Sequence, residues 1–368
     1  MKRILVMGMS KDRGGMETFI MNYYRHIDHN KFQFDFISYN EAPYCAQEIE
    51  ALGGRCFVIT GRFTDYRKNK KELKDLFASH GNEYAALWYN CCLVSDLTIL
   101  KLAAKYNIPR RIVHAHNSQA MGSALVNMLH SVYKRRMVKY ATDFWACSTE
   151  AGKFFYSKQL MDSDKFRIII NAIDTENYAF NWETRNNLRN QLGIADAFVL
   201  GNVARLDPEK NHSFLLDIFS AVRKRNSKAV LLIIGQGRLE AELKAKAKLL
   251  RLEPYVKFLG ERTDVPALYC AMDVFVLPSQ FEGLPMTLIE SQTSGLPSFT
   301  SKEAVPQKAA ATPLLSFISL HEEPEKWAEI ICAASSGEYF TDRCEAEKTM
   351  TQSMWNTTRA ASLLEELF

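Results

Sequence analysis

The sequence lacks the features that mark several common classes of protein. Its 368 residues include 8 cysteines, but these form no CxxC pair and no metal-site spacing with histidine. The 17 glycines and 11 prolines are too few for a collagen-like or low-complexity chain. No apolar run approaches the roughly 18 residues that span a bilayer, and charge and glycine interrupt the N-terminal apolar run before a signal-peptide core can form. We therefore expect a globular protein of a reducing, cytoplasmic compartment.

Familiar catalytic signatures are missing too. There is no GxSxG, Walker A or HExxH motif, so nothing supports a serine hydrolase, a P-loop NTPase or a zincin. The net charge of +4 is too small to indicate a nucleic-acid partner. Its distribution is uneven, because residues 1–185 hold 26 Lys and Arg against 19 Asp and Glu, whereas the remainder holds 20 against 23. The basic excess gathers in two runs, 62–74 and 134–139.

Short β-rich runs alternate with longer helical patterns, which predicts two doubly wound α/β lobes with parallel sheets. The first lobe has candidate strands at 4–8, 32–37, 56–59, 86–89, 111–115 and 144–147, and the second at 198–203, 230–234, 256–258, 274–277 and 297–300. We expect one domain over 1–178 and another over 179–345. A final helical pattern at 346–368 can pack on either lobe, including back on the first. Two such lobes, if they face each other, bind ligands at the carboxyl ends of their strands.

The densest motif is FVLPSQFEGLPMTLIESQTSGLP, residues 275–297. It predicts a strand, a loop with Glu282 and Gly283, and a helix that opens near Pro285. Free amides around Leu284, Met286 and Thr287 form a site for phosphate, and Glu290 can accept hydrogen bonds from ribose hydroxyls. The alternative is structural: Glu282 caps the helix and Glu290 is a solvated helix residue.

A second cluster, GNVARLDPEKN, follows the first strand of the rear lobe. Arg205 and Lys210 lie on a strand-to-helix loop, where two cations can hold a diphosphate and neutralise the charge that develops as it leaves. The alternative is that Asp207 and Glu209 pair with them on the surface. The nearby Ile234-Gly235-Gln236-Gly237 lacks the last glycine of a dinucleotide fingerprint, so it indicates a tight turn beside a nucleotide.

Two features of the front lobe also follow strands. Gly14 and Gly15 precede a helix, so their amides can approach a phosphate closely. His114 and His116 end a strand on the same side of the sheet. No carboxylate or cysteine completes a metal site around them. Either both are ordinary hydrogen-bonded histidines, or one of them contacts the substrate.

Together these residues resemble the retaining glycosyltransferases of family 4, which have the GT-B fold of two facing Rossmann-like lobes. The resemblance covers essentially the whole chain and is closest to members that build capsular or exopolysaccharides. It is carried by the motifs above with Phe258-Leu-Gly260, Asp273-Val-Phe-Val-Leu-Pro-Ser279, Gly14-Gly15-Met-Glu17, His114-Ala-His-Asn-Ser118, Cys147-Ser-Thr-Glu150 and Asn171-Ala-Ile-Asp174.

The resemblance implies roles for individual residues. Arg205 and Lys210 hold the donor diphosphate, Glu290 binds the ribose, and Glu282 contacts hydroxyls of the donor sugar. The donor-binding set it implies is Gly14, Gly15, Arg205, Lys210, Gly235, Arg262, Glu282, Gly283, Leu284, Met286, Thr287 and Glu290, and the catalytic set is His116, Glu282, Arg205 and Lys210.

The expected function is transfer of a sugar from a nucleotide-diphospho-sugar, a UDP-sugar first, to a saccharide or lipid-linked saccharide. The resemblance implies retention of anomeric configuration, and the two cations with the helix amides meet the need for positive charge without a metal or other cofactor. The basic runs of the front lobe can hold an anionic membrane surface or simply face solvent. Two alternatives stay open: a sugar-nucleotide epimerase of similar fold, and a non-catalytic partner of another glycosyltransferase.

Overall fold

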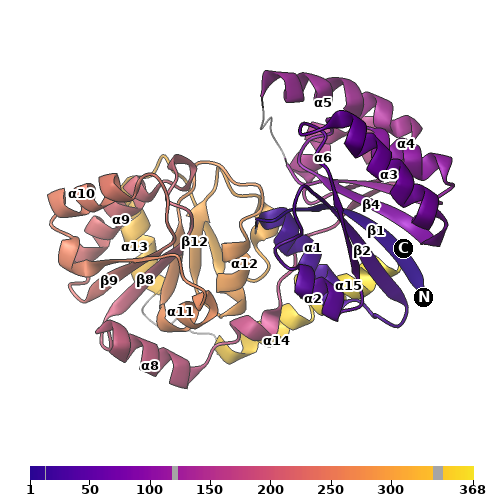
Figure 1. The fold of residues 1–368 in the computed structure, drawn as a ribbon. Helices are drawn as coiled ribbons and strands as arrows, with labels where there is room; N and C mark the ends of the chain where they lie inside the picture. The colour runs from indigo at the N-terminus through magenta and orange to yellow at the C-terminus, as the bar shows by residue number, and fades with distance from the viewer. Residues whose placement is uncertain (13, 118–122, 335–342) are drawn as a thin grey trace. The chain divides into compact units, whose positions relative to one another are not determined.

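The computed structural model describes residues 1–12, 14–117, 123–334 and 343–368, and the chain divides into two compact units (Figure 1). The first unit holds residues 1–172 and 357–368, and the second holds residues 173–356. The division therefore falls a few residues before the predicted boundary at 178, and helix α8 (Trp182–Leu192) lies shortly after that boundary.

The C-terminal segment corrects the expectation of one helix over 346–368. It forms two helices, α14 (Arg343–Thr351) in the second unit and α15 (Thr357–Glu365) in the first. The helices are separated by a turn, after which Ile173 N–H donates to the carbonyl of Trp355 at 2.9 Å and a parallel bridge joins Ile173 to Asn356. A backbone paired in this way cannot also continue the helical ladder.

The first unit is built on a seven-stranded sheet in the order β3-β2-β1-β4-β5-β6-β7. Every strand pair is parallel. Central strands read as nearly continuous apolar runs because both faces of the sheet are covered. The strands are β1 (Lys2–Met9), β2 (Phe32–Tyr39), β3 (Arg55–Ile59), β4 (Tyr84–Cys91), β5 (Arg110–Ala115), β6 (Asp143–Ala146) and β7 (Phe166–Ile168).

Helices cover both faces of this sheet (Figure 1). One face packs against α3 (Tyr66–His80), α4 (Thr98–Lys105) and α6 (Thr149–Phe155). The other packs against α1 (Gly15–His26), α2 (Ala46–Ala51) and α15. The remaining helices of the unit are α5 (Ala124–Arg136) and α7 (Lys158–Met161). Residues from the far end of the sequence thus complete the core of the first unit.

The second unit repeats the plan with a six-stranded sheet in the order β10-β9-β8-β11-β12-β13. Its pairs are also parallel. The strands are β8 (Phe198–Val203), β9 (Ala229–Ile234), β10 (Val256–Gly260), β11 (Val274–Leu277), β12 (Ser298–Ser301) and β13 (Leu315–Ile318). On one face lie α9 (His212–Arg225), α10 (Glu240–Leu249) and α13 (Pro324–Ala333), and on the other α8, α11 (Val265–Ala271) and α12 (Met286–Thr293).

The predicted α/β class with two doubly wound units is confirmed. All eleven predicted strands form, while β7 and β13 were missed. Both are short, at 3 and 4 residues, and lie at sheet edges, where one neighbour suffices and the apolar run is weak. The carboxyl ends of β8, β9, β10 and β11 lie along one edge of the second sheet, which brings the predicted loops of that unit together.

Candidate functional site

Two glycines let the loops after β8 and β9 touch at the carboxyl edge of the second sheet. A Cβ on Gly235 would lie 2.1 Å from the carbonyl oxygen of Ala204, and one on Gly237 would lie 2.6 Å from that of Leu206. The Leu206 N–H also donates to the carbonyl of Gln236 at 3.0 Å. Any side chain at either glycine would push the loops apart. Gly235, predicted to bind the donor, therefore shapes the edge through its packing.

Lys210 and Glu282 form the central contact of this edge. The Lys210 Nζ lies 2.7 Å from Oε1 and 2.9 Å from Oε2 of Glu282. Ser279 donates its hydroxyl to the same carboxylate at 2.7 Å, and the Gln280 N–H donates to the carbonyl of Glu209 at 2.8 Å. The loops after β8 and β11 are thus joined by one partly buried ion pair and one backbone hydrogen bond. The alternative in which Glu282 caps α12 is not what the structure shows.

The chain enters α12 with its first amides uncapped by any side chain of the described residues. Pro285 is the N-cap residue, so Met286 and Thr287 lie in the first turn, whose N–H groups have no partner within the helix. Leu284 is half-buried. A Cβ on Gly283 would meet no atom within 4 Å, so the approach to these amides is open. Such a helix start favours an anion.

Glu290, in the middle of α12, is held by two phenols that were not predicted from the sequence. The Tyr269 hydroxyl donates to its Oε2 at 2.8 Å, and Tyr178 also hydrogen-bonds the carboxylate. Burial raises the pKa of Glu290, and the two tyrosine bonds offset part of that rise. Glu290 is thus a fixed, partly desolvated acceptor, not the solvated residue of the alternative interpretation. Partners 21 positions apart in the sequence leave no local pattern by which to find them.

The two predicted arginines are not bound into this cluster. The Arg205 side chain is 74% exposed and lies 3.3 Å from Asp207 and 3.6 Å from Glu209, so for this residue the surface-pair alternative describes the structure. Arg262 forms a bidentate pair with Asp264 two residues along its own loop. Both guanidinium groups lie at the carboxyl edge of the second sheet and pair with surface carboxylates, which a ligand can replace.

In the first unit, the glycine pair begins α1 after β1. Gly14 is the N-cap residue, and a Cβ there would lie 2.6 Å from Oε2 of Glu17. A Cβ on Gly15 would meet nothing within 4 Å. Glu17 is held by the Ser10 hydroxyl at 2.7 Å. Only Gly15 therefore has the open surroundings that a phosphate approach requires.

The two histidines of the first unit lie among aromatic rings at the end of β5. The ring centroids of His114 and His116 are 4.2 Å apart, and the edge of Phe19 packs against both. Trp88 donates its indole N–H to Nδ1 of the fully buried His114 at 3.2 Å. Burial lowers the pKa of His116 to about 3, so this imidazole is neutral at physiological pH. His114 is a structural residue, whereas His116 is half-buried.

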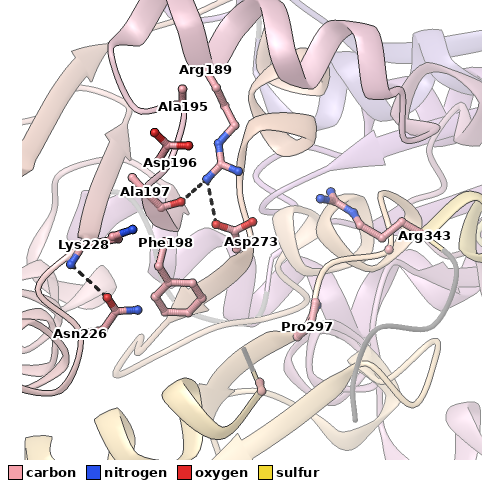
Figure 2. Close-up of a pocket in the computed structure, with 12 residues that line it drawn as sticks. Arg189, Ala195, Asp196, Ala197, Phe198, Asn226, Lys228, Asp273, Pro297 and Arg343 are labelled. Carbon is pink, nitrogen blue, oxygen red and sulfur yellow. Dashed lines mark hydrogen bonds and ion pairs between the residues drawn. The ribbon is translucent and has the colours of Figure 1, made fainter. Parts of the chain in front are cut away.

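A cavity of about 400 Å³ lies at the opposite, amino edge of the second sheet (Figure 2). Arg189 donates to Asp273 at 3.0 Å and to the carbonyl of Ala197, and Arg343 donates to the carbonyl of Ser294 at 2.9 Å. Ser294 is the C-cap residue of α12, whose negative dipole end a guanidinium neutralises, and Ala197 directly precedes β8. We therefore assign the arginines of this cavity to the stability of the unit.

The residues that the structure describes contain neither a metal-binding cluster nor a membrane-spanning helix. No group of three or more His, Cys, Asp or Glu side chains is arranged to hold a metal ion within that part of the chain. Over the same residues, no helix combines the length and apolar character needed to cross a bilayer.

The family model "Glycosyl transferases group 1" matches residues 184–338, which contain the Lys210, Glu282 and Glu290 cluster. EpsF of Bacillus subtilis (strain 168), which is named as a glycosyltransferase, is 33% identical over 346 residues, or 91% of this chain and 88% of that protein. An Escherichia coli protein named UDP-Gal:alpha-D-GlcNAc-diphosphoundecaprenol alpha-1,3-galactosyltransferase is 29% identical over 243 residues, or 64% of this chain and 60% of its own length.

Solved structures share the fold. Anabaena HepE, crystallised in complex with UDP and glucose, superposes with a TM-score of 0.74 at 19% identity, over 100% of this chain and 99% of that one. This likeness extends over both units and confirms the GT-B architecture expected from the motifs. With a relative as similar as EpsF over nearly the whole length, the chain belongs to the group 1 glycosyltransferases and is a glycosyltransferase enzyme of GT-B fold.

Proposed function

We propose that the enzyme is a retaining, metal-independent glycosyltransferase of capsular or exopolysaccharide assembly. It moves a sugar from a nucleotide-diphospho-sugar, a UDP-sugar first among the candidates, to a saccharide or lipid-linked saccharide. The observation that carries the proposal is the Lys210 and Glu282 pair beside the open N-terminus of α12. The UDP of the HepE complex and the UDP-sugar and diphosphoundecaprenol in the name of the E. coli relative support the donor and acceptor classes.

In this proposal each group of the second unit has one task. Lys210, Arg205 and the amides of Met286 and Thr287 hold the donor diphosphate. Arg205 reaches it by exchanging its exposed partners for phosphate oxygens. Glu290 accepts hydrogen bonds from the ribose hydroxyls and is kept in place by Tyr269. The remaining donor contacts of this unit come from Arg262, Gly283 and Leu284, and Gly235 keeps the loop that carries Arg205 in place.

The chemistry needs stabilisation of the leaving group more than a nucleophile on the protein. As the bond between the anomeric carbon and the diphosphate oxygen breaks, negative charge grows on that oxygen, and cations and amides already aimed at it lower the barrier. The acceptor oxygen forms the new bond on the same face and gives its proton to the departing phosphate. Glu282, fixed by Lys210 and Ser279, orients hydroxyls of the donor sugar.

A panel of UDP-, GDP-, ADP- and TDP-sugars tests the donor class by thermal shift, because selective binding raises the melting temperature. The selected donor is then incubated with saccharide and undecaprenol-linked acceptors, with and without EDTA, and the anomeric configuration of the product is read by NMR. We expect transfer with retention in both conditions. Conversion of the donor sugar without acceptor would show an epimerase, and donor binding without transfer to any acceptor would show a non-catalytic partner.

We also propose peripheral attachment to an anionic membrane through α5 in the first unit. The outward side chains of its first turns are apolar, with Leu125, Met128 and Val132 exposed by 55%, 58% and 41%. The exposed Arg135 and Arg136 follow at the end of the same helix. An apolar stripe next to cations is typical of a helix that lies in the headgroup region. In the run at 62–74, by contrast, lysines of α3 pair with acids on the same helix.

Flotation with vesicles of 70% phosphatidylcholine and 30% phosphatidylglycerol tests this attachment. We expect the parent to float and the Leu125→Glu, Met128→Glu double variant to remain in the soluble fraction. Lys71→Ala is the matched control on α3, and it should float like the parent. Equal flotation of the parent with vesicles of phosphatidylcholine alone would contradict the role of the cations.

A further inference from the structure

The carboxyl edge of the first sheet contains a buried amide that no motif of the sequence singled out. Asn90 lies next to the end of β4 and is 1% exposed. Its side-chain Oδ1 lies 2.8 Å from Nε2 of His116, and its Nδ2 donates to the carbonyl of Trp88 at 3.4 Å. Because the Trp88 carbonyl oxygen can only accept a hydrogen bond, the amide nitrogen of Asn90 faces Trp88. The amide oxygen of Asn90 therefore faces His116. The proton of this imidazole is therefore on Nε2.

The position of Asn90 is itself enforced by the neighbouring strand. Gly8 of β1 has φ +127, and a Cβ there would lie 2.7 Å from the Cβ of Asn90. The register between β1 and β2 shifts between Met7 and Met9, so the strand is irregular at this glycine. The absence of a side chain at Gly8 thus makes room for the amide beside the histidine.

The surroundings of His116 keep it uncharged. Burial lowers its pKa to about 3, and the adjacent His114 ring is neutral because burial lowers its pKa well below the ordinary value. The elements packed around it also contain three thiols and one acid: Cys91 at the end of β4, Cys92 directly after it, Cys147 after β6, and Glu17 of α1, which Ser10 holds. Burial raises the pKa of Cys91 and of Cys92, so both thiols stay protonated.

With Nε2 committed to Asn90, the second ring nitrogen keeps its lone pair. Nδ1 of His116 makes no hydrogen bond to any of the described residues. We propose that Asn90 is a positioning residue that fixes His116 as the neutral Nε2–H tautomer, so that Nδ1 accepts a hydrogen bond from a substrate hydroxyl. The substrate part rests on the proposed function, because the hydroxyl belongs to a sugar substrate of that reaction. The tautomer part stands on the geometry alone.

Asn90→Asp tests the contact with substrate. A carboxylate beside Nε2 raises the pKa of the imidazole, and the imidazolium that forms has a proton on Nδ1 and cannot accept. We expect the ratio of kcat/KM between variant and parent to fall by about tenfold as the pH decreases from 8 to 6, close to one lost hydrogen bond of about 1.4 kcal/mol. Asn30→Asp, an exposed site at the other end of the same unit, should give a ratio independent of pH. A flat ratio for Asn90→Asp would overturn the contact.

Nitrogen NMR of the parent tests the tautomer without any activity. With ¹⁵N-labelled histidine, and a His116→Gln sample for assignment, we expect a protonated Nε2 and an unprotonated Nδ1 from pH 6 to 8. In Asn90→Ala, which leaves the ring without this acceptor, the two tautomers should mix. A protonated Nδ1 in the parent, or an unchanged spectrum in Asn90→Ala, would overturn the positioning role whether or not transfer is ever observed.

Discussion

At the amino ends of their strands, both units are stabilised by a carboxylate that pairs with two arginines. In the first, the fully buried Asp35 of β2 accepts from Arg3 at 2.9 Å and from Arg55 at 2.6 Å. In the second, Asp273 just before β11 accepts from Arg189 at 3.0 Å and also from Arg185. Each unit therefore contains one carboxylate clamped by two guanidinium groups, which ties neighbouring elements together.

At the carboxyl ends of the strands the units differ. The second unit places an ion pair, Lys210 with Glu282, and a desolvated Glu290 there, whereas the first places the neutral rings of His114 and His116. Charge at one edge suits a diphosphate, and neutral hydrogen-bonding rings at the other suit a sugar. The amino ends thus share a stabilising arrangement, whereas the carboxyl ends of the two units differ in charge.

The largest effect on stability is expected from removing the carboxylate that pairs with two arginines in each unit. Asp35→Asn and Asp273→Asn each leave two arginines without their carboxylate, which costs about 3 kcal/mol of unfolding free energy. Calorimetry measures the loss. The exposed Asp75→Asn, which breaks a surface pair with Lys71, is the control and should cost under about 0.5 kcal/mol. Equal losses for control and test variants would contradict the common role.

The pH dependence sharpens this test for Asp35. Burial raises its pKa, but the hydrogen bonds from Arg3 and Arg55 outweigh burial and hold the pKa below the ordinary value. The stabilisation is therefore present above the unfolded-state pKa and is lost as the pH falls through the folded-state value. The stability gap between parent and Asp35→Asn should narrow in acid, and a gap that widens there would contradict the sign.

Lys210→Ala tests the charged edge. It removes the cation and leaves Glu282 with Ser279 alone, so we expect kcat to fall by about 10²-fold, as for the loss of one preorganised charge in a transition state. Lys248→Ala, an exposed lysine of α10, is the matched control and should retain parental kcat. A parental rate in Lys210→Ala would remove this residue from the site.

Glu290→Gln separates binding from stability. We expect about tenfold weaker donor binding by calorimetry, because an amide is a poorer acceptor for ribose hydroxyls than a carboxylate. Burial raises the pKa of Glu290, so its ionised form destabilises the fold as the pH rises above the ordinary value. The variant should therefore melt no lower than the parent at pH 8. A lower melting temperature with unchanged donor binding would make Glu290 structural.

The smallest effect is expected at Arg262. Its guanidinium already pairs with Asp264 in solvent, so Arg262→Ala should change donor affinity by under about threefold. Titration with the selected nucleotide-sugar measures it. A tenfold loss would show that this loop meets the nucleotide base directly.

The sequence predicted the fold well because buried parallel strands are apolar along their whole length. Ile4, Leu5 and Val6 are each 0% exposed, and such runs are visible without any tertiary information. The break between α14 and α15 was not predictable, since it depends on the pairing of Ile173 with Asn356, far apart in the sequence. Helical periodicity alone does not reveal that a residue distant in the sequence will bind the backbone and interrupt the helix.

The candidate site was predicted in its residue types but not in its pairings. Loop position after a strand was enough to nominate Lys210 and Glu282, yet their mutual contact joins loops 72 positions apart. The local alternative, pairing with acids of the same loop, holds only for Arg205. Tyr269 and Asn90 were not predicted, because each acts by a hydrogen bond to a residue distant in the sequence, Glu290 and His116 respectively. No local spacing along the chain reveals such a contact.

Helix α15 has a consequence for synthesis on the ribosome. Residues 357–368 supply Ala361, Leu364 and Phe368 to the core of the first unit, where the Phe368 ring centroid lies 5.8 Å from that of Trp88. Translation makes Trp88 early and its packing partner hundreds of codons later. The second unit, a continuous stretch of chain, is able to fold during elongation, while the unit begun first has to wait for the last codons of this sequence before its hydrophobic interior is closed.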